Sequence, residues 1–188
     1  MPTYVGMLRA VNVSGQNRVP MADLRRALEG AGLTDVETYV QSGNVVFDAA
    51  GDDAAEQADA VHGVIESAFG LDVSVIALSA AELAGVAAEN PFVADADEKA
   101  LHVTFLERPV DAAAFGGLKL PAAPGEAAAL AASGRLVYLH LPHGYGRTKL
   151  NNAWFERALK VRATTRNWRT VQALTALAAR PASTPSEG

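Results

Sequence analysis

The chain has 188 residues, of which 49% are apolar, and carries a formal net charge of −5 at pH 7. This length and composition allow a buried core in one domain or in two small ones, and the absence of cysteine excludes disulfides, thiolate metal sites and a cysteine nucleophile. A cysteine-free chain suits a reducing compartment, and the sequence has neither a signal peptide nor an apolar run of roughly 20 residues, so we expect a cytoplasmic protein without a membrane partner.

The first half of the chain predicts the element order β-α-β-β-α-β. After Pro20, the residues Met21, Leu24 and Leu28 recur at the spacing of one helical face. We expect a strand over 4–9, a helix over 21–31, a hairpin over 36–47, a helix over 52–69 and a strand over 73–78. This order is that of the split βαβ, or ferredoxin-like, unit, in which an antiparallel sheet carries both helices on one face.

The second half repeats this order more loosely. We expect helices over 79–89, 112–115, 150–160 and 166–179, and strands over 101–106, 127–132 and 136–141. Together they predict a βαββα-type unit with two C-terminal helices, a candidate degenerate copy of the first unit. The end of the chain is rich in proline and serine, which predicts a disordered tail. The predicted organisation is an α+β protein with units over 1–78 and 79–179 and a tail over 180–188.

The charges are segregated along the sequence. Between Arg26 and Lys99 all the Asp, Glu, Lys and Arg residues are acidic, whereas the basic residues from Arg135 to Arg180 are opposed by Glu156 alone. A basic segment of this kind can attract a phosphate or another anion despite the acidic total. The alternative is that the acidic and basic segments neutralise one another within the molecule, which is the commoner role of charge runs.

Three blocks of the sequence resemble a known family. They cover residues 8–21 (LRAVNVSGQNRVPM), 39–47 (YVQSGNVVF) and 163–171 (ATTRNWRTV). In these blocks the chain resembles the uncharacterised bacterial domain-of-unknown-function family 1697. The resemblance implies an α+β fold built around ferredoxin-like units and no established activity. The first block departs from the family pattern at Ser14 and Gln16, where the family favours Gly and Lys. If that Lys contacts an anion in the family, this chain would depend on Arg18 instead.

The loop after the first strand is a candidate anion-binding loop. It follows Arg9 and places Asn12, Asn17 and Arg18 around Gly15, directly before a predicted helix. Such a loop can present backbone N–H groups and a cation to an anion, although its spacing is not that of a P-loop. The structural alternative is that its asparagine and glycine residues satisfy unusual backbone dihedrals. The sequence supports both interpretations equally.

The segment 41–44 (QSGN) is interpreted as a tight turn, because Ser-Gly meets the backbone demands of a hairpin. A Ser42 nucleophile would need a neighbouring base, and the local sequence offers none. We expect this turn to lie at the opposite end of the sheet from the loop after the first strand.

Two later segments place cations before predicted helices. Arg147 and Lys149 lie in a glycine-containing loop, and Thr148 is the expected N-cap of the helix over 150–160. These two cations at a helix start form a candidate anion site. The nearby His140 and His143 flank a proline that prevents helical alignment, and no third ligand is close, so we expect no metal site there.

The third block predicts the start of the last helix. Thr164 or Thr165 is expected to cap it, which would place Arg166, Asn167 and Arg169 near its N-terminus. Arginine at this end opposes the helix dipole, so we expect a compensating carboxylate or an external anion.

Three hypotheses of function follow. The first is a binding or regulatory protein for an anionic small molecule that carries phosphate or carboxylate, with nucleic acid less favoured because the sequence pI is about 5.3. The second is a hydrolase or transferase that uses His140 or His143 as acid–base group. The third is an interaction module that forms a homo-oligomer. No cofactor is indicated. The candidate ligand-binding residues are Arg9, Asn12, Asn17, Arg18, Arg147, Lys149, Thr165, Arg166 and Asn167.

Overall fold

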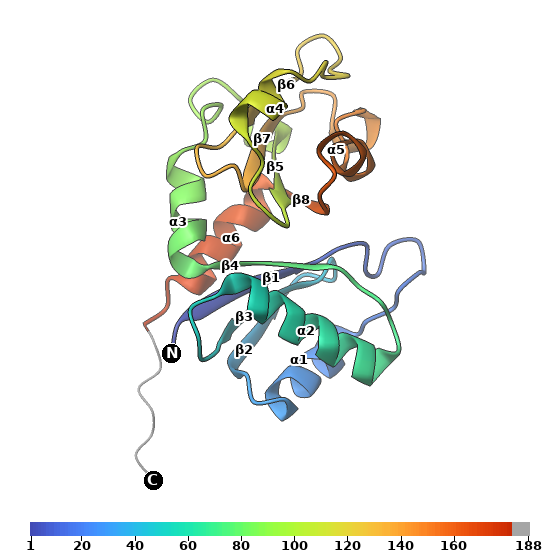
Figure 1. The fold of residues 1–188 in the computed structure, drawn as a ribbon, viewed down its shortest axis with the longest axis vertical. Helices are drawn as coiled ribbons and strands as arrows, with labels where there is room; N and C mark the ends of the chain where they lie inside the picture. Colours follow the sequence, from blue (N-terminus) through green and yellow to red (C-terminus); the bar gives the residue numbers. More distant parts are fainter. Residues whose placement is uncertain (182–188) are drawn as a thin grey trace. The chain divides into compact units, whose positions relative to one another are not determined.

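The computed structural model describes residues 1–181 of the chain. It contains two four-stranded antiparallel sheets together with helices, which confirms the predicted α+β class. The chain divides into two compact units (Figure 1): unit 1 comprises Met1–Gly85 and the segment from Leu174 onward, and unit 2 comprises Val86–Ala173. Apart from its first two residues, the predicted tail over 180–188 lies outside the described residues.

Unit 1 has the predicted order β-α-β-β-α-β. Its elements are β1 (Thr3–Leu8), α1 (Met21–Gly30), β2 (Thr34–Tyr39), β3 (Asn44–Asp48), α2 (Ala54–Phe69) and β4 (Val75–Ser79), and α3 (Ala80–Ala88) follows them. The strands lie in the order β2-β3-β1-β4, so β1 and β3 are central. Both neighbours of β1 are antiparallel to it.

The core of unit 1 lies between the sheet and the helices α1 and α2, which cover one face (Figure 1). Leu24 and Leu28 of α1 and Ile65 of α2 are fully buried there, against Phe47 of β3. Burial of these side chains stabilises the unit because each removes apolar surface from water. The helix α2 begins after Asp53, whose carboxylate accepts a hydrogen bond at the first turn.

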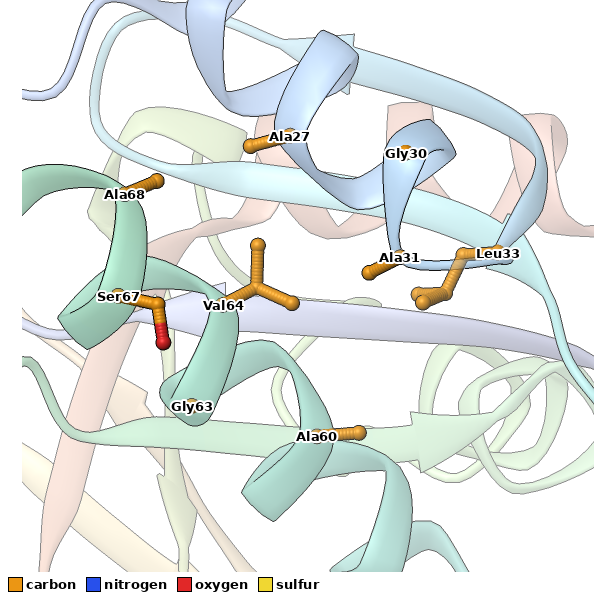
Figure 2. A pocket seen from close by; sticks show the side chains of 9 residues that line it. All are labelled: Ala27, Gly30, Ala31, Leu33, Ala60, Gly63, Val64, Ser67 and Ala68. Carbon is orange, nitrogen blue, oxygen red and sulfur yellow. The ribbon is translucent and has the colours of Figure 1, made fainter.

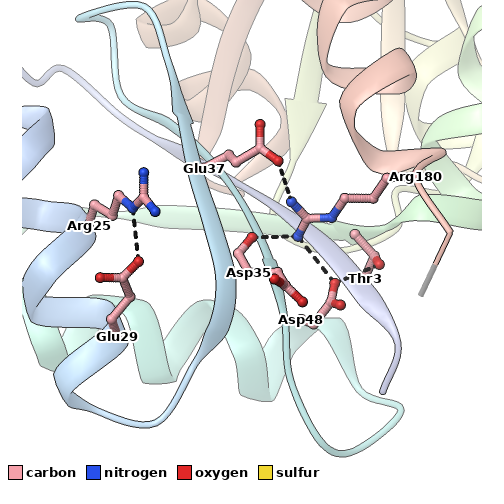
Figure 3. A network of polar contacts seen from close by, with 7 residues as sticks. All are labelled: Thr3, Arg25, Glu29, Asp35, Glu37, Asp48 and Arg180. Carbon is pink, nitrogen blue, oxygen red and sulfur yellow. Dashed lines mark hydrogen bonds and ion pairs between the residues drawn. The ribbon is translucent and has the colours of Figure 1, made fainter. Parts of the chain in front are cut away.

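The end of the described chain is anchored to unit 1 by Arg180. Its guanidinium donates to Glu37 Oε1 at 2.7 Å, to Asp48 Oδ1 at 3.3 Å and to the carbonyl oxygen of Asp35 at 2.5 Å. Figure 3 shows this cluster, in which Thr3 also donates to Asp48. A residue of the basic C-terminal segment therefore pairs with the acidic segment, as the intramolecular interpretation of the charges proposed.

Unit 2 repeats the order of unit 1. Its elements are the short helix η1 (Glu98–Ala100), β5 (Leu101–Leu106), α4 (Ala112–Gly116), β6 (Ala127–Leu130), β7 (Leu136–His140), the short helix η2 (Tyr145–Arg147), α5 (Asn152–Leu159), β8 (Ala163–Asn167) and α6 (Trp168–Ala178). The strands lie in the order β6-β7-β5-β8, which is the same succession as β2-β3-β1-β4. The core of the unit gathers around Leu139 and Phe155.

The strand β8 corrects the prediction for the third block. Residues 163–167 were expected to cap and begin the last helix, but they pair antiparallel with β5, with Thr165 opposite Thr104 and Asn167 opposite His102. Thr164 and Thr165 therefore do not cap α6. Threonine favours strands as well as helix caps, and the ladder with β5 selects the strand. With β8 in place, unit 2 has the full order β-α-β-β-α-β rather than βαββα.

No helix within residues 1–181 combines the length and the apolar character needed to cross a bilayer.

Candidate functional site

The loop after β1 and the β2–β3 turn lie side by side in unit 1, which corrects the expectation that they lie at opposite ends of the sheet. Because β1 and β3 are antiparallel and Met7 is opposite Asn44, the end of β1 adjoins the start of β3. Asn12 Nδ2 donates to the carbonyl oxygen of Gln41 at 2.7 Å. The blocks over 8–21 and 39–47 therefore meet in space.

The two asparagines of this loop hold its backbone. Asn12 Nδ2 also donates to the carbonyl oxygen of Val19, and Asn12 Oδ1 accepts from Val19 N, each at 2.9 Å. Asn17 Nδ2 donates to the carbonyl oxygen of Ala10 at 3.2 Å. These contacts favour the structural interpretation of Asn12 and Asn17. Arg18 is exposed, and Arg9 is half-buried at the end of β1.

The same loop and turn concentrate left-handed backbone. Positive φ is found at Ala10, Asn12, Ser14, Asn17 and Val40, none of which is glycine. Such conformations are uncommon for residues with a Cβ and persist where surrounding contacts hold them. The hydrogen bonds of Asn12 and Asn17 supply part of that support.

A hollow of about 710 Å³ lies between α1 and α2 on unit 1 (Figure 2). Its lining residues are small or apolar: Ala27, Gly30, Ala31, Leu33, Ala60, Gly63, Val64, Ser67 and Ala68. Figure 2 shows Val64 pointing between the two helices. None of the lining residues carries a charge, so this hollow offers little chemistry for recognising an anion.

The histidines of the segment after β7 have local partners. His140 faces the ring of Phe92, with centroids 6.1 Å apart, and His143 Nε2 lies 3.0 Å from the carbonyl oxygen of Pro124. Among residues 1–181, no group of three or more His, Asp or Glu residues is arranged to hold a metal ion.

The start of α5 differs from the prediction. Asn151 caps the helix, because its Oδ1 accepts from Trp154 N at 3.0 Å. Thr148 precedes the cap; its hydroxyl donates to Glu126 Oε2 and accepts from Leu150 N, each at 3.0 Å. Thr148 is therefore not the N-cap.

Arg147 and Lys149 are also displaced from the helix start. Arg147 is the last residue of the short helix η2. The side chains of Arg147 and Lys149 are both exposed, and both residues precede the N-cap Asn151. The prediction that these two cations stand at the start of α5 is wrong, because the helix begins two residues later than expected.

A cleft of about 420 Å³ opens in unit 2 beside the start of α6. Its lining residues come from four elements: Glu98 and Lys99 from η1, His102 from β5, Asn167 from β8 and Arg169 from α6. The pairing of β5 with β8 places His102 opposite Asn167, and η1 runs directly into β5. The strand that the sequence analysis missed therefore builds one wall of this cleft.

The first turn of α6 contributes both a cap and a cation to the cleft. Asn167 Oδ1 accepts from Thr170 N at 2.8 Å, as an N-cap does. Arg169 lies in that turn, where the partial positive charge of the helix end opposes a guanidinium. The predicted conflict with the dipole therefore applies to Arg169, while Arg166 lies in β8.

His102 forms an uncharged wall of the cleft. Its ring stacks on Tyr145, with centroids 5.4 Å apart and planes inclined by 24°. Burial lowers the pKa of His102, and the neighbouring Ala100 carbonyl partly opposes this effect. The imidazole is therefore neutral at pH 7. Its Nδ1 is buried and has no hydrogen-bond partner within the described part of the chain.

Arg166 belongs to the interior of unit 2. It is 8% exposed, and its Nη1 donates to Thr164 Oγ1 at 2.8 Å and to the carbonyl oxygen of Thr165 at 3.0 Å. Burial lowers the pKa of Arg166 to about 10, so the guanidinium stays protonated at neutral pH. The Thr165 hydroxyl bonds Thr104 and Asn152. These contacts hold Arg166 and Thr165 within unit 2.

Of the residues proposed from the sequence, Asn167 lines the cleft, and Arg169 was recognised only for its position near a helix end. Sequence reasoning missed Glu98, Lys99 and His102. Lys99 carried a usable signal, because it is the first basic residue after the long acidic segment. His102 carried none, since it is an isolated histidine in a mainly apolar strand.

By its fold, the chain is an α+β protein with two units, each built on a four-stranded antiparallel sheet. The sequence matches the family described as protein of unknown function DUF1697 over residues 1–138. The chain belongs to this family. The blocks over 8–21 and 39–47 lie within the matched residues, and the block over 163–171 lies beyond them.

A solved structure is similar in fold. It is that of the conserved bacterial protein SP0830 from Streptococcus pneumoniae, which superposes with a TM-score of 0.73 at 22% sequence identity. The similarity covers 94% of this chain and 98% of that one. At this identity the likeness shows the fold alone. A comparison with curated proteins finds no match.

Proposed function

We propose that unit 2 binds a small molecule through an anionic group, such as a phosphate or a carboxylate, in the cleft beside α6. One observation carries the proposal: Lys99 and Arg169 line the same cleft, and neither forms an ion pair with any residue in the described range 1–181. Two cations that line one cleft and are not ion-paired with a protein carboxylate are suited to share an external anion.

The surroundings favour an anion at this position. The N-terminus of α6 presents the positive end of its dipole, so a bound anion would relieve the conflict between that dipole and Arg169. His102 is neutral when the cleft is empty, and an anion beside it would stabilise the imidazolium form. The volume of about 420 Å³ falls in the range of small-molecule sites.

This location replaces the one expected from the sequence. Arg147 and Lys149 are exposed cations of a separate segment, and neither lines the cleft. The alternative of a hydrolase or transferase that uses His140 or His143 has no support from the cleft, because neither histidine lines it.

The proposal can be tested with sulfate, whose charge is constant between pH 5 and 8. We expect sulfate to raise the melting temperature of the protein relative to chloride at equal ionic strength, by mass action on the native state. The shift should be lost in Lys99→Gln and Arg169→Gln. The exposed Arg157, on α5 of the same unit, supplies the control Arg157→Gln, which should keep it.

Acidification provides a second readout. Because bound sulfate raises the pKa of His102, binding takes up a proton, and its affinity should increase from pH 8 to pH 6. His102→Asn should remove most of this dependence. An identical sulfate shift in all the variants, or no shift in the wild type, would show that the cleft does not bind anions.

A further inference from the structure

We infer that the ligand of this cleft is a zwitterion, in which an ammonium group lies a few bonds from the anionic group. This inference rests on the proposed function and adds the chemical class of the ligand. It starts from Glu98, which lines the cleft together with Lys99 and Arg169 and which forms no ion pair within the described residues.

The carboxylate of Glu98 is exposed and has a partner on α6. The side-chain amide of Gln172 satisfies its partners when its nitrogen lies toward Glu98. In this orientation the amide nitrogen donates to Glu98 Oε1 at 2.5 Å, and the amide oxygen accepts from Trp168 Nε1 at 3.3 Å. Trp168 is 4% exposed, so this chain of contacts ties the carboxylate to a buried side chain. One carboxylate oxygen is used by Gln172, and the other is available to a ligand.

The same short helix supplies charges of both signs. Glu98 and Lys99 are consecutive in η1, whose first turn is capped by Asp97, with Lys99 N donating to Asp97 Oδ1 at 3.0 Å. The cleft therefore presents two cations and one carboxylate. A carboxylate in the cleft repels a polyanion such as a nucleotide and attracts an ammonium group.

A small zwitterion satisfies all three charges at once. Its anionic group would lie between Lys99 and Arg169, near the start of α6, and its ammonium group would donate to Glu98. The cleft volume of about 420 Å³ suits a molecule of the size of an amino acid or a phosphorylated amino alcohol.

Matched pairs of ligands test this inference. The pairs are β-alanine with propionate, glutamate with glutarate, and O-phosphoethanolamine with ethyl phosphate; in each pair the first member carries the amine. We expect isothermal titration calorimetry to show a preference of about tenfold or more for the amine in at least one pair. Glu98→Gln should bring the two members of that pair close to equal affinity.

The exposed Glu107, which also belongs to unit 2, supplies the control Glu107→Gln, and this variant should keep the preference. Equal binding within every pair, or a preference that survives Glu98→Gln, overturns the inference while leaving anion binding in place. Absence of binding for every ligand and for sulfate overturns the proposed function as well. The two failures are therefore distinguishable.

Discussion

Gly43 combines two constraints at a single residue. Its φ is +85°, a left-handed conformation, and a Cβ there would lie 2.4 Å from Val11 Cγ2 and 2.8 Å from Leu8 Cβ. The turn therefore needs glycine both for its backbone and for the close approach of the loop after β1.

Replacement of Gly43 by alanine should destabilise unit 1 by about 3 kcal/mol, because left-handed strain and overpacking add. Gly15→Ala is the matched control: Gly15 also has positive φ, but no atom lies within 4 Å of its Cβ position, so we expect about 1 kcal/mol. Hydrogen exchange of the β1 amides would measure both. Equal losses in the two variants would show that the contact with Val11 and Leu8 does not limit the turn.

The turn at Gly43 could be predicted from the sequence, but the packing of Val11 and Leu8 against it could not. Ser42-Gly43 is a local signal of a hairpin, and local signals suffice to place a turn. The proximity of Val11 depends on the antiparallel pairing of β1 with β3, which is a long-range property of the sheet. The cleft also depends on a long-range property of a sheet, because Lys99 and Arg169 are brought together by the pairing of β5 with β8.

Among the elements, α5 shows how a cap sets the start of a helix. Asn151 Oδ1 accepts from Trp154 N, and the Thr148 hydroxyl is engaged by Leu150 N and Glu126 instead. Asparagine and threonine are both common caps, and the sequence analysis chose Thr148, three residues before the observed cap. The contact of Thr148 with Glu126, which is distant in sequence, engages its hydroxyl and leaves the cap to Asn151.

Asn151→Ala should lower the stability of unit 2 by about 1 kcal/mol, because the first turn of α5 loses its side-chain acceptor. Asn151→Asp keeps an acceptor and should restore most of the loss. The protein has two tryptophans, Trp154 and Trp168, and both lie in unit 2, so their fluorescence during urea unfolding follows this unit. Stability of Asn151→Ala equal to the wild type would contradict the assignment of the cap.

The second unit is where predictions from sequence were least complete. The strands β5 and β7 were predicted within one residue of their observed ends, because apolar runs mark them. The strand β8 carries Thr-Thr-Arg-Asn, which lacks an apolar pattern and contains residues suited to a helix start. Its conformation is decided by hydrogen bonds to β5, so only the tertiary structure reveals it.

For the molecule as a whole, Arg180 links the end of the described chain to the sheet of unit 1. Its side chain is 18% exposed and that of Asp48 is 2% exposed, so the pair is largely shielded from water. Arg25 and Glu29 form a comparison within the same unit (Figure 3), because their side chains are 55% and 41% exposed. Shielding increases the cost of removing one partner of an ion pair.

Arg180→Ala should destabilise unit 1 by about 2–3 kcal/mol, since it leaves the buried Asp48 carboxylate without its cation. Arg25→Ala should cost much less, as expected for an exposed pair on one helix. Far-UV circular dichroism during urea unfolding, with hydrogen exchange of the β3 amides, would measure the difference. If the two variants lost equal stability, the Arg180 cluster would be no more than a surface contact.

The division of unit 1 into two stretches of sequence has a consequence for biosynthesis. Arg180 is 132 residues later in the chain than Asp48, and the whole of unit 2 is translated between them. The ribosome therefore releases β1 to β4 long before the guanidinium that completes their charge cluster. The N-terminal unit is the first to be synthesised and the last to acquire its full set of contacts, so it must remain folded or protected in the interval without them.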